Sequence, residues 1–334
     1  MNSKYEILFF DETQKKEWDN LIIKNSGEFL QSWAWGDFQQ QIGRKVWRLA
    51  MGDSALFATI VKHNLLFGWS YLYVPRGPFF QNVSVLEIFL REVRKIAAEE
   101  KSIFLRIEPT CRDITPIKNE FKKFGFQKTA SIQPKDTLVL DLTRSVDILL
   151  KEMQLQTRQH IRHAERRGVK IIKPTELSEK QKSFEDFYCL LEATAQRNHF
   201  KIYPKNYYRQ ILNLTGNFNA KILTAELNKK TISAAIFIFY GATATYLYSA
   251  SATGYGRFNA PSLVLWSAIL EAKNMTFRNF DFWGISAVNR RWQGLTAFKK
   301  SFGGNEEHYI GTWDISLDKK FYLAYKVLKK LIKR

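Results

Sequence analysis

The sequence predicts a mixed α/β fold in which the second half of the chain repeats the plan of the first. Each half contains short runs rich in β-branched and aromatic residues, separated by turns, and these favour hairpin strands over a regular strand–helix alternation. Each half then continues with apolar residues at helical spacing and one more strand. The chain has 334 residues, 45% of them apolar, which is enough for two packed domains.

The first half contains elements with clear boundaries. Apolar residues near helical spacing predict the first helix, Pro109 ends the strand that follows it, and Gly125 ends the second helix. The expected elements are strands at 45–51, 55–65, 69–74 and 103–108, helices at about 85–100 and 114–124, and closing strands near 126–132 and 137–142.

The second half repeats this order. Gly168 ends its first helix, and a stripe that includes Phe184, Phe187 and Leu191 predicts its longest one. The expected elements are helices at 146–167, 178–199 and 262–274, a short strand (VKII), strands at 218–226, 231–240, 243–251 and 278–283, a last strand near 307–313, and a basic helix at 318–333.

Both halves therefore show the order of elements of an N-acetyltransferase (GNAT) fold. The Q/RxxGxG/A loop that binds the pyrophosphate of acetyl-CoA is missing from both. After the strand at 243–251 the sequence reads SATGYGRFNAPS, which does not match that loop. We therefore do not expect acetyl-CoA to be the donor.

Charge and cysteine content narrow the function further. The formal net charge of +19 predicts attraction to polyanions such as nucleic acid or anionic lipid, with a general solubility effect as the alternative. The two cysteines, Cys111 and Cys189, have no metal-ligand spacing, so we expect ordinary thiols and no zinc site. No apolar run is long enough to span a membrane and no signal peptide is recognisable, so a cytoplasmic protein is expected.

Seven segments resemble those of one family in the expected order, across almost the whole chain. They are FLQSWAWGDFQ (29–39), YVPRGP (73–78), LRIEP (105–109), TRQHIRHAERRGV (157–169), TAQRNHF (194–200), the run from YLYSASATGYG to FWGI (246–285) and FKKSFGG (298–304). Together they resemble the FemABX family of peptidoglycan-bridge aminoacyltransferases. Since no heptad run is present, the chain is similar to compact, FemX-like members without a coiled-coil arm.

The resemblance implies two GNAT-like subdomains with a cleft between them. We expect an acceptor-precursor subdomain at 1–145, an aminoacyl-tRNA subdomain at 146–316, and a helix at 317–334 that packs back on the first. The implied reaction transfers an aminoacyl group from aminoacyl-tRNA to the stem peptide of a peptidoglycan precursor. The ester carries the free energy, so neither a cofactor nor a metal is expected.

The resemblance also implies site residues. Lys299, beside Phe298, matches the functional lysine and would stabilise an oxyanion or hold the tRNA terminus; a solvated surface lysine is the alternative. Glu108 matches an acidic position near the acceptor and would orient or deprotonate the attacking amine, or else be a structural carboxylate paired with Arg106 or another base. The tRNA ribose hydroxyl is an alternative proton shuttle.

Further residues are implied on the acceptor side. Tyr248 and Tyr207 match tyrosines that line the acceptor site, with core packing as the alternative, and Arg76 would grip a phosphate or carboxylate. Asp37 and Tyr203 stand where relatives have the lysine and arginine that grip a diphosphate. An aspartate would repel that group, which favours a lipid-linked acceptor held differently, with Arg76 or Lys205 as substitute contacts. The sequence leaves a nucleotide-linked acceptor open.

Two basic helices are visible without the resemblance. Arg158, Arg162 and Arg166 recur every four residues, which places them on one helix face for an RNA contact or for solvent. The C-terminal helix is amphipathic and lysine-rich, and it either packs on its own protein or touches the inner face of the plasma membrane. The other functions considered are an aminoacyl-tRNA-dependent transferase acting on protein or lipid, and a non-catalytic RNA-binding protein.

Overall fold

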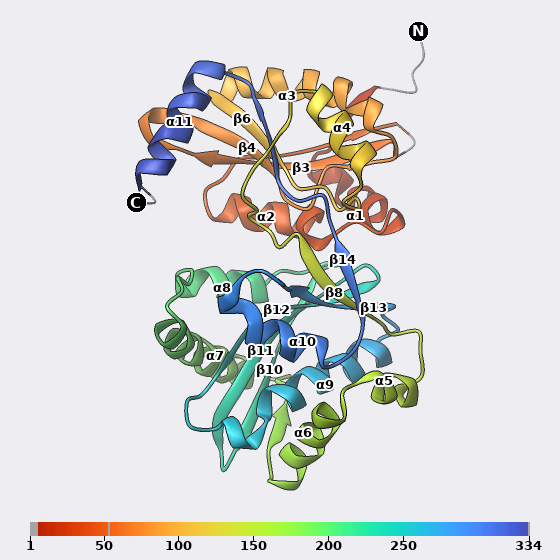
Figure 1. Ribbon diagram of the computed structural model, residues 1–334, viewed down its shortest axis with the longest axis vertical. Coiled ribbons are helices and arrows are strands. Elements are labelled where there is room, and N and C mark those ends of the chain that lie inside the picture. The colour runs from red at the N-terminus through yellow and green to blue at the C-terminus, as the bar shows by residue number, and fades with distance from the viewer. Residues whose placement is uncertain (1–5, 53, 333–334) are drawn as a thin grey trace. The chain divides into compact units, whose positions relative to one another are not determined.

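The computed structural model describes residues 6–52 and 54–332 and contains two compact units. Unit 1 consists of the chain up to Lys135 together with the segment from His308 onward, and unit 2 runs from Asp136 to Glu307 (Figure 1). The chain therefore passes from one unit to the other twice. The sequence placed these passages after residues 145 and 316, so both lie earlier than expected.

Unit 1 is built on one mixed sheet. An antiparallel meander leads to helix α3, whose apolar stripe from Leu86 to Ala97 is buried in the core, and the chain returns in a strand parallel to the end of the meander. The sheet order is β1(Ile7–Phe9), β2(Val46–Met51), β3(Leu56–Asn64), β4(Ser70–Val74), β6(Ser102–Ile107), β15(Trp313–Ser316) and β7(Gln127–Lys128), with β5(Phe79–Phe80) paired to β3. Its helices are α1(Lys15–Lys24), α2(Trp33–Gln41), α3(Leu86–Glu100), α4(Thr115–Lys123) and α11(Lys319–Ile332).

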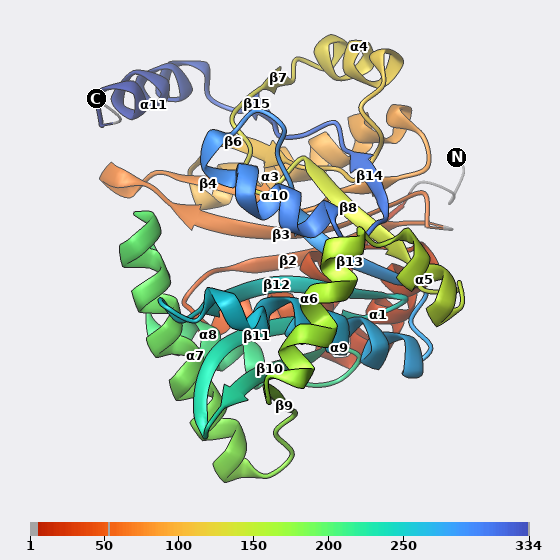
Figure 2. The same cartoon turned by 60° about the horizontal axis from the view of Figure 1, so that its bottom comes forward.

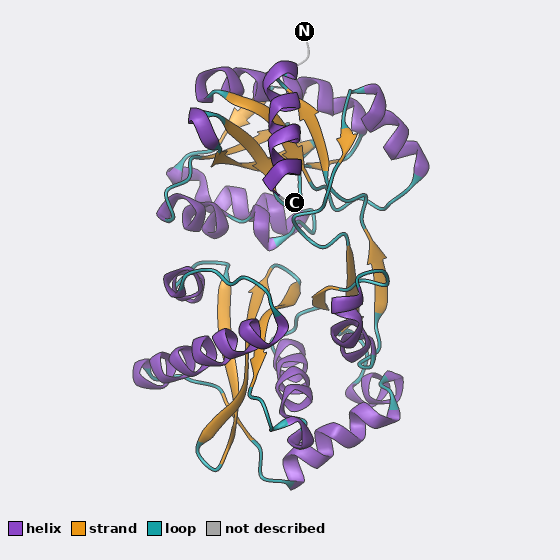
Figure 3. Ribbon diagram, turned by 60° about the vertical axis from the view of Figure 1, so that its left-hand side comes forward, coloured by secondary structure: helices purple, strands orange, loops and turns teal. Residues whose placement is uncertain are grey.

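Unit 2 repeats this arrangement, as the sequence predicted. Its meander also leads through a helix, α9, to a parallel strand, and α9 and α6 pack together over one face of the sheet (Figure 3). The sheet order is β14(Asn305–His308), β8(Asp136–Asp141), β13(Asn279–Gly284), β12(Thr243–Ser251), β11(Lys230–Tyr240), β10(Asn219–Leu227) and β9(Lys170–Ile172). Its helices are α5(Val146–Glu152), α6(Leu155–Arg166), α7(Leu177–Asn198), α8(Lys205–Leu212), α9(Ala260–Asn274) and α10(Gln293–Lys300).

Three expected strands differ from the structure. The strand expected at 137–142 is β8, which pairs with β13 in unit 2 rather than closing unit 1. The strand expected near 307–313 is wrong, because β14 and β15 flank a loop in which Gly311 has a φ of +79° and they join different sheets. Of the strand expected at 126–132, only the two residues of β7 form a strand. The amides of Ile132 and Gln133 donate to the Glu108 carboxylate instead of to a sheet.

The helix expected at 146–167 is two helices, α5 and α6. Met153 between them has extended backbone (φ −66°, ψ 147°) and a buried side chain. Arg158 stabilises this break, because its Nη1 donates to the carbonyls of Leu150 and Met153, each at 2.7 Å. The side chain that was expected to face RNA therefore holds the end of α5.

Helix α11 packs on unit 1, in agreement with the expected return of the C-terminal helix (Figure 2). The ring of Tyr322 lies 5.2 Å from that of Phe104 on β6, and the Tyr322 hydroxyl donates to Asp314 at 3.0 Å. Lys333 and Arg334, which the sequence analysis included in the basic helix region, lie outside the described residues. None of the described helices has the length and apolar character needed to cross a bilayer.

Candidate functional site

In unit 2, the side chain of Lys299 lies where two parallel strands separate. The ladder between β12 and β13 covers Thr243 to Thr245 and Asn279 to Asp281, and both strands continue beyond it. Lys299, on α10, donates from Nζ to the carbonyl of Gly284 at the end of β13, at 2.7 Å. The same Nζ lies 5.7 Å from the ring centre of Tyr246 on β12. The lysine thus touches both strands at the point where they diverge.

Burial makes this lysine unusual. Its side chain is 4% exposed, and loss of solvent lowers the pKa of Lys299 to about 8, although the negative charge of Asp281 opposes the shift. Asp281 is itself buried and accepts hydrogen bonds from the Trp283 amide at 2.7 Å and from the Thr137 hydroxyl. A lysine with such a pKa can change its charge near neutral pH, which a solvated lysine cannot. The alternative of a surface lysine does not fit this burial.

The wall of a cavity of about 450 Å³ includes two neighbours of Lys299. Phe298 precedes the lysine in the sequence, and Tyr246 lies near its Nζ in space. Polar groups reach the cavity from several elements, including His160 on α6, Arg197 on α7 and Asn259 at the start of α9. Its volume and its wall of both apolar and polar residues suit a small ligand or the end of a larger one.

A β-bulge at Leu247 sorts the tyrosines of β12 onto opposite faces of the sheet. Tyr246 pairs with Phe237 and Tyr248 with Ile236, so Leu247 is the extra residue. Tyr248 therefore joins a cluster of tyrosines away from Lys299. In this cluster the rings of Tyr203 and Tyr207 stack at 4.0 Å, and Tyr208 meets Tyr248 edge to face at 5.0 Å. Burial and the neighbouring tyrosines raise the pKa of Tyr248 well above its usual value.

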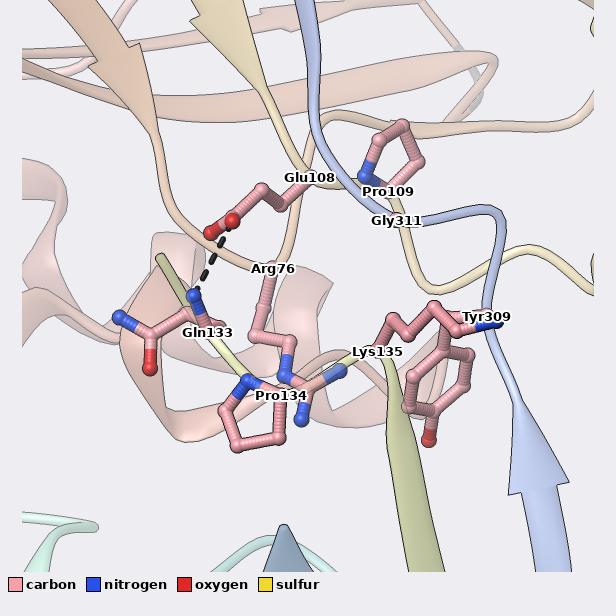
Figure 4. A pocket seen from close by; sticks show the side chains of 8 residues that line it. All are labelled: Arg76, Glu108, Pro109, Gln133, Pro134, Lys135, Tyr309 and Gly311. Carbon is pink, nitrogen blue, oxygen red and sulfur yellow. Dashed lines mark hydrogen bonds between the residues drawn. The ribbon is translucent and has the colours of Figure 1, made fainter. Parts of the chain in front are cut away.

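In unit 1, Glu108 is the centre of a buried hydrogen-bond network. Its Oε1 accepts from the Gln133 amide at 3.0 Å (Figure 4), from the Ile132 amide at 2.8 Å and from the Thr312 hydroxyl. Its Oε2 accepts from the Tyr73 hydroxyl. Burial, followed by the charge of Glu108, raises the pKa of Tyr73 well above its usual value. The carboxylate thus joins three segments of unit 1.

Glu108 does not pair with Arg106, the partner considered from sequence. Arg106 instead forms two hydrogen bonds of 2.7 Å with Asp314 on β15. Both Glu108 and Arg106 lie on β6 or directly after it, and their side chains meet different neighbours. The bidentate pair links β6 to a strand that is 208 residues away in the chain.

Arg76 lies beside Glu108 at the rim of a small hollow (Figure 4). The residue is 4% exposed, has a φ of +50°, and places its guanidinium 4.7 Å from the ring centre of Tyr309. Gln133 and Lys135 line the same hollow, whose volume of about 10 Å³ suits little more than one water molecule. The hollow brings two basic side chains together next to a buried carboxylate.

Comparison with known proteins identifies the family. The sequence profile of the FemAB family matches residues 13–232 and 215–330. The chain belongs to the FemAB family.

Relatives match along nearly their whole length. The lipid II:glycine glycyltransferase of Staphylococcus epidermidis is 24% identical, with 92% of each chain covered, and the aminoacyltransferase FemA of Staphylococcus aureus is 22% identical, with 93% of this chain and 98% of the relative covered. The alignment with the Staphylococcus epidermidis protein runs over 389 positions, more than the 334 residues of this chain. That relative therefore contains residues without a counterpart here.

Solved structures support the fold. A crystal structure of FemX has a TM-score of 0.81 at 19% identity and covers 96% of this chain and 99% of its own. A tandem GNAT protein from the clavulanic acid pathway has a TM-score of 0.57 at 12% identity, covering 93% and 98%. The expected family and the two GNAT-like subdomains are therefore confirmed. Within residues 6–52 and 54–332, the longest helix is α7 with 22 residues.

The remaining candidates take different places. Asp37 forms ion pairs with Lys15 at 3.2 Å and with the buried Arg48 at 2.7 Å, so its charge is balanced within unit 1. Lys205 pairs with Glu185, and Tyr203 is half exposed beside Tyr207. On α6, Arg162 and Arg166 are exposed, whereas Arg158 is used at the end of α5.

Sequence reasoning missed several partners of the named residues. Tyr208 completes the tyrosine cluster, and Tyr246, Gly284 and Asp281 surround Lys299. All but Tyr208 lie within the segment 246–285 that carries the longest resemblance, which is the signal that pointed to this region. The last glycine of the FKKSFGG segment, Gly304, packs closely against β8. A Cβ at this position would lie 2.8 Å from the Val139 carbonyl oxygen.

Proposed function

We propose that this protein transfers an aminoacyl group from aminoacyl-tRNA to the stem peptide of a peptidoglycan precursor. The observation that carries the proposal is the buried Lys299, with its pKa near 8, at the separation of β12 and β13, where its neighbours Phe298 and Tyr246 line a cavity of about 450 Å³. The names of the FemAB relatives, glycyltransferase and aminoacyltransferase, agree with it. We further propose that the work is done on the cytoplasmic side of the membrane.

The reaction is aminolysis of an ester. The amine of the stem peptide attacks the aminoacyl carbonyl, a C–N bond forms, and the C–O bond to the tRNA ribose breaks. The proton lost by the amine passes to the leaving ribose oxygen, directly or through a protein group. The ammonium of Lys299 stabilises the oxyanion that develops on the carbonyl, and its dry surroundings strengthen this effect. Glu108, the sequence candidate for orienting the amine, already accepts four hydrogen bonds, so in this proposal it supports the fold around the site.

In this proposal the aminoacyl-tRNA, which is the donor, binds to unit 2. The cavity is wide enough for an aminoacyl ester and the sugar that carries it. His160 on α6 lines the cavity, and the same helix exposes Arg162 and Arg166 to solvent. Phosphates in the acceptor stem of the tRNA would contact these arginines while the 3′ end of the tRNA enters the cavity. Arg158 is set aside, because it holds the end of α5.

For the acceptor, we propose the lipid-linked precursor. Relatives named lipid II:glycine glycyltransferase are in accord with this choice. Asp37 is balanced by Lys15 and Arg48 and offers a diphosphate no cationic contact of its own. Arg76, stacked on Tyr309 beside Lys135, is the candidate cationic contact in unit 1, and Tyr248 and Tyr207 are the candidate hydrogen-bonding groups in unit 2.

The deciding experiment gives the purified protein a mixture of charged tRNAs with either the lipid-linked or the nucleotide-linked precursor. We expect the mass of the lipid-linked precursor to increase by one or more amino-acid residues, and ribonuclease to abolish the increase. Uncharged tRNA is the control. A mass increase only on the nucleotide-linked precursor would refute the choice of acceptor. No increase on either, with tRNA bound, would favour a protein or lipid acceptor or a non-catalytic RNA-binding protein.

A further inference from the structure

Large apolar side chains are exposed at the turn between β3 and β4 of unit 1. Leu66 is 64% exposed and Phe67 is 77% exposed. Phe67 has a φ of +61°, a left-handed conformation that bulky residues rarely adopt. Trp69 follows just before β4, with its ring centre 6.0 Å from that of Phe67. The turn therefore holds aromatic and aliphatic groups in water, where burial would be favourable.

Helix α11 continues this apolar surface. The ring of Phe321 lies 4.5 Å from that of Trp69, and Figures 1 and 2 show α11 beside this end of the hairpin. The inner side of α11 packs through Tyr322 and Tyr325 on Phe104. Its outer stripe is also apolar, because Leu323, Val327 and Leu331, spaced four residues apart, are 65%, 51% and 61% exposed.

Among the described residues, nineteen large apolar side chains are exposed, and seven of them lie on these two elements. Exposed apolar residues scattered singly are ordinary, but a contiguous patch marks an interaction surface. We call the outer stripe of α11 together with the turn at 66–69 the α11 face.

The charge on helix α11 has one sign. The helix sequence KKFYLAYKVLKKLI contains five lysines and no acidic residue. Lys101, exposed just before β6, lies next to the hairpin, because its carbonyl accepts from the Ser70 amide at 3.2 Å. An apolar face bordered by lysines matches the interface of an anionic bilayer, in which apolar groups insert while lysines meet lipid phosphates. A second copy of this chain would bring lysine against lysine.

We propose that the α11 face docks the protein on an anionic phospholipid surface, with Phe67 and the stripe from Leu323 to Leu331 entering the headgroup region. Docking would bring unit 1 to the membrane in which a lipid-linked acceptor resides. The inference adds to the proposed function but is measured independently of it, since vesicle binding requires neither tRNA nor precursor.

The test is flotation of the full chain with vesicles of phosphatidylglycerol in phosphatidylcholine, and with vesicles of phosphatidylcholine alone. We expect the anionic vesicles to bind the protein more tightly, by roughly fivefold for each lysine that meets the charged surface, and this preference to weaken in high salt. Phe67→Ser and Leu323→Ser should each weaken the binding several-fold. Leu177→Ser, at a side chain that is 80% exposed on α7 in unit 2, is the matched control and should bind as the unchanged protein does.

Several results would overturn the proposal. One is no binding to anionic vesicles, and another is binding that Phe67→Ser and Leu323→Ser leave unchanged. Self-association that these substitutions abolish, seen by sedimentation equilibrium, would assign the α11 face to a second copy. Loss of tRNA binding in the same variants would assign it to RNA. Vesicle binding without any aminoacyl transfer would contradict the proposed function and leave the docking surface intact.

Discussion

Glu108 in unit 1 and Lys299 in unit 2 are buried to the same extent, each 4% exposed, yet their surroundings differ. Glu108 accepts four hydrogen bonds, from two amides and two hydroxyls. The Nζ of Lys299 donates to one carbonyl at 2.7 Å, and its neighbours Phe298 and Tyr246 line a large cavity. A buried charge surrounded by donors stabilises the fold around it, whereas a buried charge with few partners keeps interactions available for a substrate.

This difference suggests a division of work between the units. The segment around Glu108 is held by hydrogen bonds that are complete without a ligand, and its hollow holds about one water. The segment around Lys299 is destabilised by desolvation of the ammonium, and that cost is typical of a site that stabilises charge during a reaction. The predictions below, from the largest effect to the smallest, test whether this contrast holds.

The largest effect is expected from Glu108→Ala. It leaves two amides and the hydroxyls of Tyr73 and Thr312 without their acceptor, so the free energy of unfolding should fall by about 3–5 kcal/mol. Urea denaturation measures it. The control is Glu120→Ala, which removes a half-exposed carboxylate from a surface pair with Lys123 and should change stability by less than about 1 kcal/mol. A Glu108→Ala protein of full stability but without transfer activity would instead make Glu108 a catalytic group.

Lys299→Met should act on the reaction instead of the fold. We expect kcat/KM for aminoacyl transfer to fall by about 10²–10³-fold, the usual loss when an oxyanion contact is removed. The matched control is the next residue, since Lys300 is 38% exposed and pairs with Glu306, and Lys300→Met should leave the rate nearly unchanged. An equal loss of kcat/KM in Lys299→Met and Lys300→Met would mean that the positive charge of the segment matters, and not the buried position of Lys299.

The lowered pKa of Lys299 also predicts a pH dependence of stability. The ordinary pKa of 10.5 is lowered to about 8, so the unfolded chain binds this proton more tightly than the folded one between those values. The stability of the unchanged protein relative to Lys299→Met should therefore rise between pH 8 and 10.5, by about 3 kcal/mol. Urea titrations of both proteins at several pH values measure it. A constant difference would show that the lysine is solvated.

The smallest effects separate two arginines of α6. Arg158→Ala should lower the free energy of unfolding by about 1 kcal/mol, because three carbonyls at the end of α5 lose their donor. Arg162→Ala should leave stability unchanged but reduce the salt dependence of tRNA binding by about one phosphate contact. Denaturation and filter binding at several salt concentrations give the two readouts. The reverse pattern would place Arg158 at the RNA.

Local pattern was sufficient for most elements of both units. The helical stripe of α3 and the β-branched runs of β10, β11 and β12 were predicted within a few residues of their observed ends. These elements are determined by the period of their apolar residues, which is a property of neighbouring positions. The break between α5 and α6 was not predicted, since it depends on Met153 being buried and on the bonds from Arg158.

The candidate site could be located by sequence but not understood from it. The FKKSFGG segment pointed to Lys299, but only the fold places Gly284 and Tyr246 against its Nζ. Glu108 was recognised as a candidate, but its donors come from residues 24 to 204 positions away in the chain. Asp37 was expected to repel a diphosphate, and the ion pair with Arg48 that balances its charge was not visible in the sequence.

The sequence by itself determined the identity and order of most elements, the repeated plan, the family and the excess of positive charge. The tertiary structure decided which sheet β8 and β15 join, which buried charges are satisfied, and that the turn at 66–69 lies beside α11. The reason is physical. Periodicity and propensity act over a few residues, whereas strand pairing, desolvation and surface patches arise from residues that are distant in the chain and meet only in the folded protein.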